Sequence, residues 1–349
     1  LLVQGILAAH PCLVASDAVF HAHNLQAVAN GDFRLTSLTP HDPPFQFPYG
    51  GSFYFLLGPL LHTGIDLTTL VRAFASASAF AAAAALFAWL APGGVKRAAL
   101  TVGLLQLMPV GFDLFGAGHY SNVFSQSVLL VFLAWWGGQG PGGPILGALL
   151  LGVGATAHFG GLLFLIPLGG LLFLTEVGAR DRGRMWALAL GGGLAAAYYL
   201  QFLGLMLDQV PRALGGGGAG GTGALAGLAA EMGHAASEWG LPLLGLAACG
   251  WASRGVSFYW GPNGPRALAV LGLAGLPFLA AAAASPLAVR YLYAVAPAVA
   301  LFAADGLVAA MAPGRGAPLR RALGLAALLA QTVLFLAAVA WTLFERYRA

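Results

Sequence analysis

Two acids and two histidines lie close together between Ser16 and Phe33, in a chain of which only 8% is charged. Asp17 and His21 are four residues apart, so a helix would place them on one face. His21 and His23 would point about 200° apart on that helix, and a metal held by both would require a strand instead. A partly desolvated carboxylate has a raised pKa and can take the proton of a hydroxyl group. We therefore predict Asp17 as a general base with His21 beside it, although an acid in a first turn also complements the helix dipole.

The composition defines the class of protein in which these residues must act. Hydrophobic residues make up 59% of the 349 residues, and the mean hydropathy is +0.82. A soluble domain typically carries about 25% charged residues. The chain therefore reads as an all-α, polytopic integral membrane protein, with one transmembrane domain over residues 1–349. The arginines are scattered and form no basic patch, so nucleic acid is not an expected partner.

The apolar runs predict about eleven transmembrane helices. The first, residues 1–14, would reach only about 21 Å, less than the roughly 30 Å of a hydrocarbon core. The others are predicted at about 69–91, 98–112, 121–136, 144–157, 159–175, 185–206, 239–252, 266–284, 288–311 and 322–343. The pair 144–157 and 159–175 could instead be one long helix or a re-entrant element.

Two long polar regions, 15–68 and 207–238, are predicted as outer loops because of the charges in the remaining loops. Cytoplasmic loops carry an excess of Lys and Arg. With residues 15–68 outside, the cytoplasmic loops receive Lys96, Arg97, Arg180, Arg182, Arg184, Arg254, Arg266, Arg315, Arg320 and Arg321. Most acids and histidines then lie on the extracytoplasmic side of a multi-pass protein of the plasma (inner) membrane. In the second loop, the glycine-rich run 215–227 could be a mobile linker or a lid.

The first outer loop contains a predicted amphipathic juxtamembrane helix. Ser16 is a suitable N-cap and Gly31 a suitable C-cap. Phe20, Leu25 and Val28 form an apolar stripe that could lie on the bilayer surface. The following segment, residues 40–62, is rich in proline and aromatic residues, and its prolines exclude a regular helix through 40–48. This segment either returns as a kinked chain into the next span or lines a substrate groove, with rings such as that of Tyr49 stacking on sugar faces.

Further polar residues lie near the predicted helix ends. Asp113 could help to hold a divalent cation, Mg or Mn, or it could be a carboxylate that faces water. His119 and Tyr120 add hydrogen-bonding groups to the same short loop. His158 is flanked by apolar sequence, where an ionisable residue is either functional or a satisfied structural group.

A late span carries Arg290 and Tyr291 near its predicted outer boundary. Arg290 could extend to the interface as an anchor. It could also bind the phosphate of a lipid carrier, because a guanidinium group makes multidentate phosphate contacts. Asp305 lies near the inner end of that span and has no local partner in the sequence. We therefore predict that it forms a hydrogen bond to another helix.

The order of these features resembles the GT-C superfamily of polytopic membrane glycosyltransferases. The resemblance rests on SDAVFHAHNLQAVANGDF, FQFPYGGSFYFLLGPLL, GHYSNVFSQSVLLVFLAWW and RYLYAVAPAVALFAADGL, in that order. It implies a polyprenyl-phosphate-linked sugar as donor and an outer-face active site whose base, an Asp of the first outer loop, matches Asp17. Arg290 stands where a contact to the carrier phosphate is expected. The paired Asp-Glu and Asp-x-Asp patterns of some branches are absent, so the resemblance does not imply a metal.

The expected reaction is transfer of a sugar to a glycan, lipid or protein acceptor with inversion at the anomeric carbon, beside membrane lipids. Two alternatives stay open. A lipid or solute transporter would favour polar groups near the middle of the membrane. A non-catalytic scaffold subunit of a larger membrane complex would fit the small number of acids.

Overall fold

The computed structural model describes residues 16–38, 46–138, 142–179, 181–208, 229, 232–233, 235–260, 265–275, 293–314 and 316–348. Of the described residues 86% are helical, so the all-α prediction is confirmed. Two short strands, β1 (Thr36–Leu38) and β2 (Gln46–Pro48), pair antiparallel with Ser37 opposite Phe47. No helix forms at 46–48, as the prolines predict.

The helices follow most of the predicted apolar segments. In chain order they are α2 (Ser16–Ala29), α3 (Ser52–Leu57), η1 (Gly58–Thr63), α4 (Leu67–Leu90), η2 (Ala91–Gly93), α5 (Val95–Gln106), α6 (Pro109–Gly116), α7 (Tyr120–Gly137), α8 (Gly143–Ala157), α9 (Phe159–Ala179), α10 (Arg182–Leu200), α13 (Leu241–Arg254), α14 (Val256–Trp260), α15 (Arg266–Ala274), α17 (Ala296–Met311) and α18 (Ala317–Arg348).

Within the described part of the chain, three helical segments are long and apolar enough to cross a membrane: Leu67–Gly93, Tyr293–Met311 and Ala317–Trp341. A fourth is added if α5 and α6 form one broken span, since they meet at 45°. Pro109 explains that break, because it lies in the first turn of α6 and cannot continue the preceding helix. The helix α8 and the apolar segment Phe159–Thr175 of α9 are shorter, and a total of eleven spans stays a prediction.

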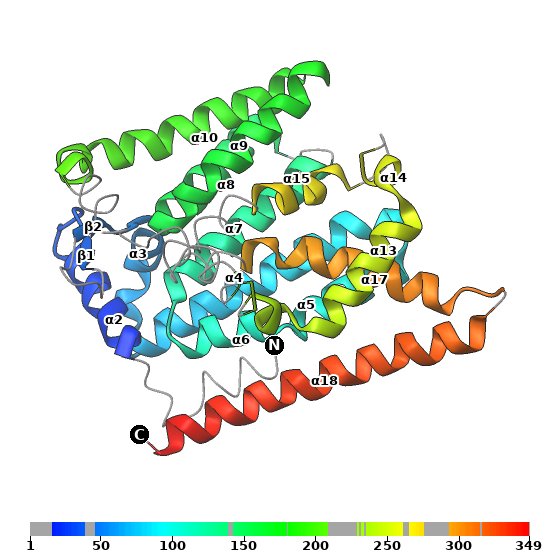
Figure 1. Cartoon of the computed structure of the whole chain (residues 1–349). Helices are drawn as coiled ribbons and strands as arrows, with labels where there is room; N and C mark the ends of the chain where they lie inside the picture. The colour runs from blue at the N-terminus through cyan, green and yellow to red at the C-terminus, as the bar shows by residue number, and fades with distance from the viewer. Residues whose placement is uncertain are drawn as a thin grey trace.

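The bundle has two distinct ends (Figure 1). At the first, called the α2 end here, α2, α3, β1 and β2 gather; at the other, the α14 end, lies α14. Helix α4 begins at the α2 end, where Asp66 caps it by accepting a hydrogen bond from the amide of Thr69 at 2.9 Å. Helix α10 begins at the α14 end after Asp181, whose carboxylate accepts from the amide of Arg184. Both starts follow the usual chemistry of an N-cap.

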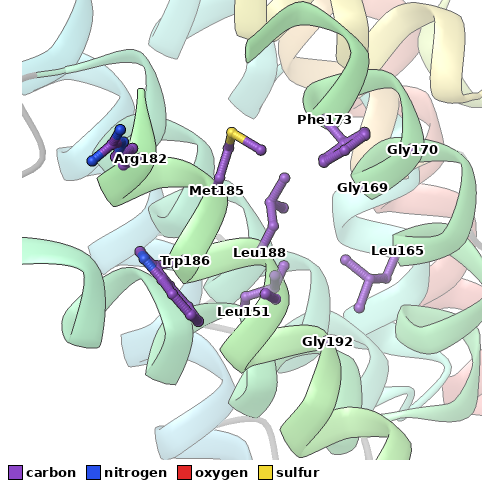
Figure 2. A pocket seen from close by; sticks show the side chains of 11 residues that line it. Leu151, Leu165, Gly169, Gly170, Phe173, Arg182, Met185, Trp186, Leu188 and Gly192 are labelled. Atoms are coloured by element: carbon purple, nitrogen blue, oxygen red, sulfur yellow. The ribbon is translucent and has the colours of Figure 1, made fainter. Parts of the chain in front are cut away.

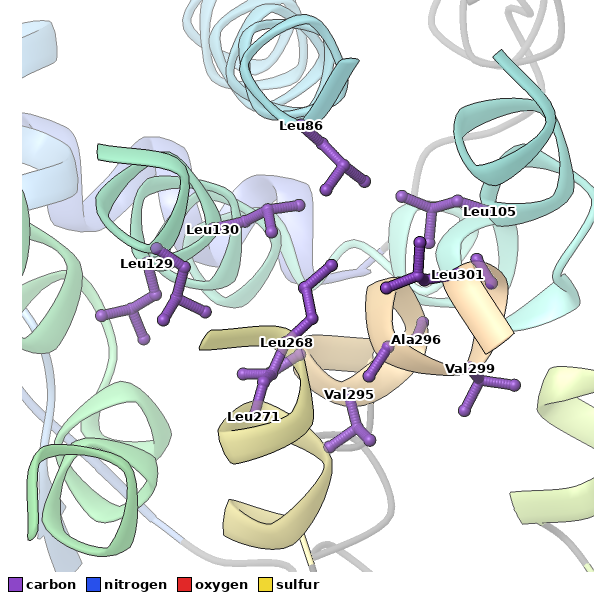
Figure 3. Close-up of a cluster of buried hydrophobic side chains, with 14 of the residues drawn as sticks. Leu86, Leu105, Leu129, Leu130, Leu268, Leu271, Val295, Ala296, Val299 and Leu301 are labelled. Carbon is purple, nitrogen blue, oxygen red and sulfur yellow. The ribbon is translucent and has the colours of Figure 1, made fainter. Parts of the chain in front are cut away.

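The central packing of the bundle depends on small residues in α13 and α17. A Cβ atom added to Gly250 would overlap the carbonyl oxygen of Phe302, and one added to Gly306 would overlap that of Leu246. The two glycines thus let the helix backbones touch, which is how membrane helices approach closely. Around this crossing, leucines from several helices form one core (Figure 3): Leu86 of α4, Leu105 of α5, Leu129 and Leu130 of α7, Leu268 of α15 and Leu301 of α17.

A charged network lies beside that crossing, at the α14 end. Asp305 is fully buried, and Arg97 donates to its two oxygens from Nε at 2.7 Å and from Nη2 at 2.6 Å. Tyr259 donates to the same carboxylate at 3.0 Å, and Nε of Arg254 lies 3.6 Å from it. Both arginines also lie over the ring of Phe258. The polar partner predicted for Asp305 is therefore confirmed, and it consists of groups from α5, α13 and α14.

The structure also decides two questions about α2 and the α8–α9 pair. Gly31 adopts a left-handed conformation, with φ of 89°, directly after α2 ends, as predicted for a C-cap. Leu25 and Val28 are buried in the protein, so the apolar stripe does not lie on the bilayer surface. Helices α8 and α9 are separate, because His158 between them takes an extended backbone.

Replacing the buried carboxylate tests the charged network. Asp305→Ala leaves the Arg97 guanidinium without its acid, and the free energy of unfolding should fall by about 3 kcal/mol or more. The double variant Arg97→Met/Asp305→Leu removes both charges and should recover most of that loss. Thermal unfolding in detergent measures both effects. The control, Asp66→Ala, removes an exposed N-cap and should cost about 1 kcal/mol; an equal loss for Asp305→Ala contradicts the prediction.

Candidate functional site

A partly exposed carboxylate–imidazole pair lies at the α2 end. Asp17 Oδ2 lies 3.2 Å from Nδ1 of His119, and the two side chains are 40% and 17% exposed. The residues are far apart in sequence, in the first turn of α2 and just before α7. Gly118 brings them together, because its φ of 86° allows the sharp turn after α6. The pair can be reached by a substrate and can exchange a proton with it.

His21 is four residues from Asp17 but has a different environment. Its side chain is buried, and Nδ1 lies 2.7 Å from the hydroxyl of Tyr54. Asn24 donates to that hydroxyl at 3.3 Å, and the His21 ring also hydrogen-bonds to the backbone of Gly118. Burial lowers the pKa of His21 to about 4, against the opposing effect of the Asp17 charge. The neutral ring therefore joins α2 to α3 and to the turn before α7.

The opposite faces predicted for the two histidines of α2 are confirmed. His21 points into the protein, whereas His23 is exposed. A helix therefore separates the two imidazoles, and a metal site that uses both does not form.

Aromatic residues from three further elements surround this cluster. Tyr49 hydrogen-bonds to the hydroxyl of Ser121 at 2.9 Å, and its ring packs edge-on against His158 at 5.6 Å. The rings of Tyr120 and His21 are also 5.6 Å apart. Six residues that the sequence predicts as site residues therefore form one connected cluster, called the α2-end site here: Asp17, His21, Tyr49, His119, Tyr120 and His158.

The proline- and aromatic-rich segment reaches this cluster through a close backbone contact. A Cβ atom at Gly50 would overlap the backbone of Ala157 and His158, so the chain after β2 lies directly against the break between α8 and α9. The hydroxyl of Tyr198 on α10 donates to the carbonyl of Tyr49 at 2.9 Å. The segment thus packs against the α2-end site, and a substrate groove along it stays a prediction.

Arg72 is a component of the site that the sequence analysis did not select. It lies in the second turn of α4, is only 7% exposed, and donates from Nε to the hydroxyl of Tyr120 at 3.2 Å. The sequence does contain a signal for it, namely an arginine within an apolar run. Ionisable groups inside a membrane span are usually functional. Its guanidinium brings a positive charge to a site whose carboxylate is Asp17.

Asp113 lies within α6, and its carboxyl group interacts with that of Glu238. The two carboxyl groups are hydrogen-bonded, and burial, followed by the charge of Asp113, raises the pKa of Glu238 to about 8. Among the described residues, no group of three or more His, Cys, Asp or Glu side chains could hold a metal ion. A divalent cation at Asp113 stays a prediction.

The predicted first span, residues 1–14, and three features of the predicted site and loops lie outside the residues that the structure describes. The three features are the candidate phosphate ligand Arg290, its neighbour Tyr291, and the glycine-rich run 215–227. Their relation to Asp17 stays a prediction.

Comparison with known proteins adds no assignment. A scan against protein-family models found no match to this chain, and a search of curated proteins found no similar sequence.

The buried histidine should make stability sensitive to acid. Between pH 6.5 and 4 the unfolded chain binds a proton at His21 and the folded protein does not, so stability falls as the pH decreases, by up to about 3 kcal/mol. His21→Gln should flatten this part of the stability profile, whereas His23→Gln, an exposed change on the same helix, should retain it. Thermal unfolding at several pH values measures the slope; identical slopes for the wild type and His21→Gln would disprove the assignment.

The raised pKa of Glu238 acts in the opposite direction. Between pH 4.5 and about 8 the folded protein keeps a proton that the unfolded chain releases, so this contribution to stability is lost as the pH rises. Glu238→Gln mimics the protonated carboxyl group and should raise the unfolding temperature above pH 8 more than at pH 5. The matched change at an exposed acid, Asp32→Asn, should show no such difference. A Glu238→Gln benefit that is independent of pH contradicts the prediction.

Proposed function

We propose that the protein is a GT-C-like membrane glycosyltransferase that moves a sugar from a polyprenyl-phosphate carrier to an acceptor. The observation that carries the proposal is the accessible Asp17 carboxylate, held at 3.2 Å by His119 within a cluster of aromatic and polar residues. The three apolar helices long enough to span a membrane are consistent with a lipid-linked donor.

Asp17 acts as the general base in this proposal. His119 fixes the orientation of the carboxylate, and the 40% exposed side chain can be reached by a hydroxyl group. The acceptor hydroxyl gives its proton to Asp17 while its oxygen attacks the anomeric carbon of the donor. The bond from that carbon to the phosphate oxygen breaks, and the polyprenyl phosphate leaves with the electron pair. A single displacement of this kind inverts the anomeric centre.

An arginine stabilises the negative charge that develops on the leaving phosphate. Arg290 has this role by resemblance. Arg72 is a second candidate, because it contacts Tyr120 inside the same cluster. The ring of His158 is partly exposed and offers a face on which a sugar can stack, whereas Tyr49 and Tyr120, only 7% and 2% exposed, support the site from within. His21, with its ring buried and neutral, positions the helix that carries Asp17.

The reaction takes place on the extracytoplasmic face of the plasma membrane. This orientation rests on the excess of Lys and Arg in the loops on the other side. The acceptor is a glycan, lipid or protein present on that face, and the α2-end site is where the donor and the acceptor meet.

Removing the base tests the proposal. Asp17→Asn retains the size and the hydrogen-bonding capacity of the side chain but cannot accept the proton, so transfer should slow by about 10²- to 10⁴-fold. The assay uses a panel of radiolabelled polyprenyl-phosphate sugars with membrane extracts as acceptor, and a symmetric gel-filtration profile confirms folding. Asp32→Asn, which changes an exposed acid after the same helix, should transfer at the wild-type rate. Near wild-type transfer by Asp17→Asn, or no transfer by the wild type with any donor, would overturn it.

A further inference from the structure

An apolar groove of about 620 Å³ lies between α8, α9 and α10, apart from the α2-end site. Leu151 and Leu165 line it from α8 and α9, and Met185 and Leu188 from α10, with Phe173 at one side (Figure 2). A cavity of this size is in the range that holds small ligands. Its walls are hydrocarbon over most of their length, which suits an acyl chain.

Glycines keep the groove open. A Cβ atom added at Gly170 on α9 or at Gly192 on α10 would meet no atom within 4 Å. Both glycines line the groove, so their missing side chains account for part of its empty volume. A Cβ atom is therefore accommodated at either position without a clash, and we expect a larger side chain there to occupy the groove.

The groove is polar at one end only. Its single charged lining residue is Arg182, in the first turn of α10, and Trp186, 60% exposed, lies one turn further along. The neighbouring Arg184 is engaged elsewhere, with the carbonyl of Gly138 at 3.1 Å and the ring of Trp136. Arginine and tryptophan side by side are typical of the boundary between lipid headgroups and hydrocarbon.

The groove has the length of one membrane leaflet, and its charged end lies on the predicted cytoplasmic side. From Arg182 to Gly192 the helix rises about 15 Å, half of the roughly 30 Å hydrocarbon core. Arg182 follows the loop between α9 and α10, which the excess of basic residues predicts to be cytoplasmic. The inner surface of that leaflet is rich in anionic lipids.

We propose that this groove binds an acyl chain of an anionic phospholipid of the cytoplasmic leaflet, with Arg182 contacting the lipid phosphate. The charge of Arg182 selects an anionic headgroup, and the glycine-opened walls of α9 and α10 receive the chain. The site is separate from the α2-end site, and it stands whether or not the protein transfers sugars.

Native mass spectrometry of the detergent-purified protein tests the site, with phosphatidylglycerol as the probe and phosphatidylcholine of the same chains as comparison. Gly192→Leu fills the groove and should abolish retained phosphatidylglycerol. Arg182→Gln removes the charge and should weaken its binding about tenfold. Two matched controls should bind like the wild type: Gly193→Leu, at a glycine next to the groove that also meets open space, and Lys96→Gln, at an exposed cation outside it.

Three results would overturn the proposal. The first is equal binding of phosphatidylglycerol by Gly192→Leu and Gly193→Leu, which places the lipid elsewhere. The second is equal binding of the two phospholipids that does not depend on Arg182, which leaves an apolar surface without headgroup recognition. The third is displacement of phosphatidylglycerol by equimolar polyprenyl phosphate, which assigns the groove to a carrier lipid. Gel filtration of each variant shows that a loss of binding does not come from unfolding.

Discussion

The buried carboxylate of Asp305 imposes the strictest constraint on this fold. A charge placed in hydrocarbon must be paired and hydrogen-bonded, because no water is present to solvate it. Arg97 and Tyr259 meet that need, with Arg254 close by, and their elements α5, α14 and α13 must therefore converge on α17. The glycine contact between α13 and α17 lies next to the same residue, so close helix packing and charge pairing hold the α14 end together.

Part of the α2 end is held together by neutral polar groups. His21, Tyr54 and Asn24 form a chain of hydrogen bonds that buries polar atoms without burying a charge. This arrangement gives two neighbouring residues different uses: the ring of His21 is fixed inside, and the carboxylate of Asp17 stays accessible beside His119. A rigid support beneath an accessible acid is what a proton-transfer site requires. The proposed lipid groove needs no such rigid support. One arginine for the headgroup and two glycines that leave space for the acyl chain are sufficient to bind a flexible lipid.

Local sequence was enough to predict much of the secondary structure. The run from Ser16 to Gly31 predicts a helix that ends at a left-handed glycine, and its spacing predicts opposite faces for His21 and His23. The positions of α4, α7, α8 and α9 agree with the apolar segments to within a few residues, because hydrophobic runs and caps are local signals. The prediction that Leu25 and Val28 lie on the bilayer surface was wrong, because both side chains are buried in the protein. An apolar stripe in the sequence does not reveal whether lipid or protein will cover it.

The composition and patterning of this sequence determined that it forms helices, where most of them begin and end, and which residues could do chemistry. Only the tertiary structure decided which of those residues meet. Asp17 joins His119 across about a hundred residues and Asp305 joins Arg97 across two hundred, and Arg72 reaches Tyr120 from a neighbouring helix. Periodicity reports the face on which a side chain lies but not the helix that packs against that face. Those pairings follow from the simultaneous packing of many helices, in which each buried polar group must find a partner.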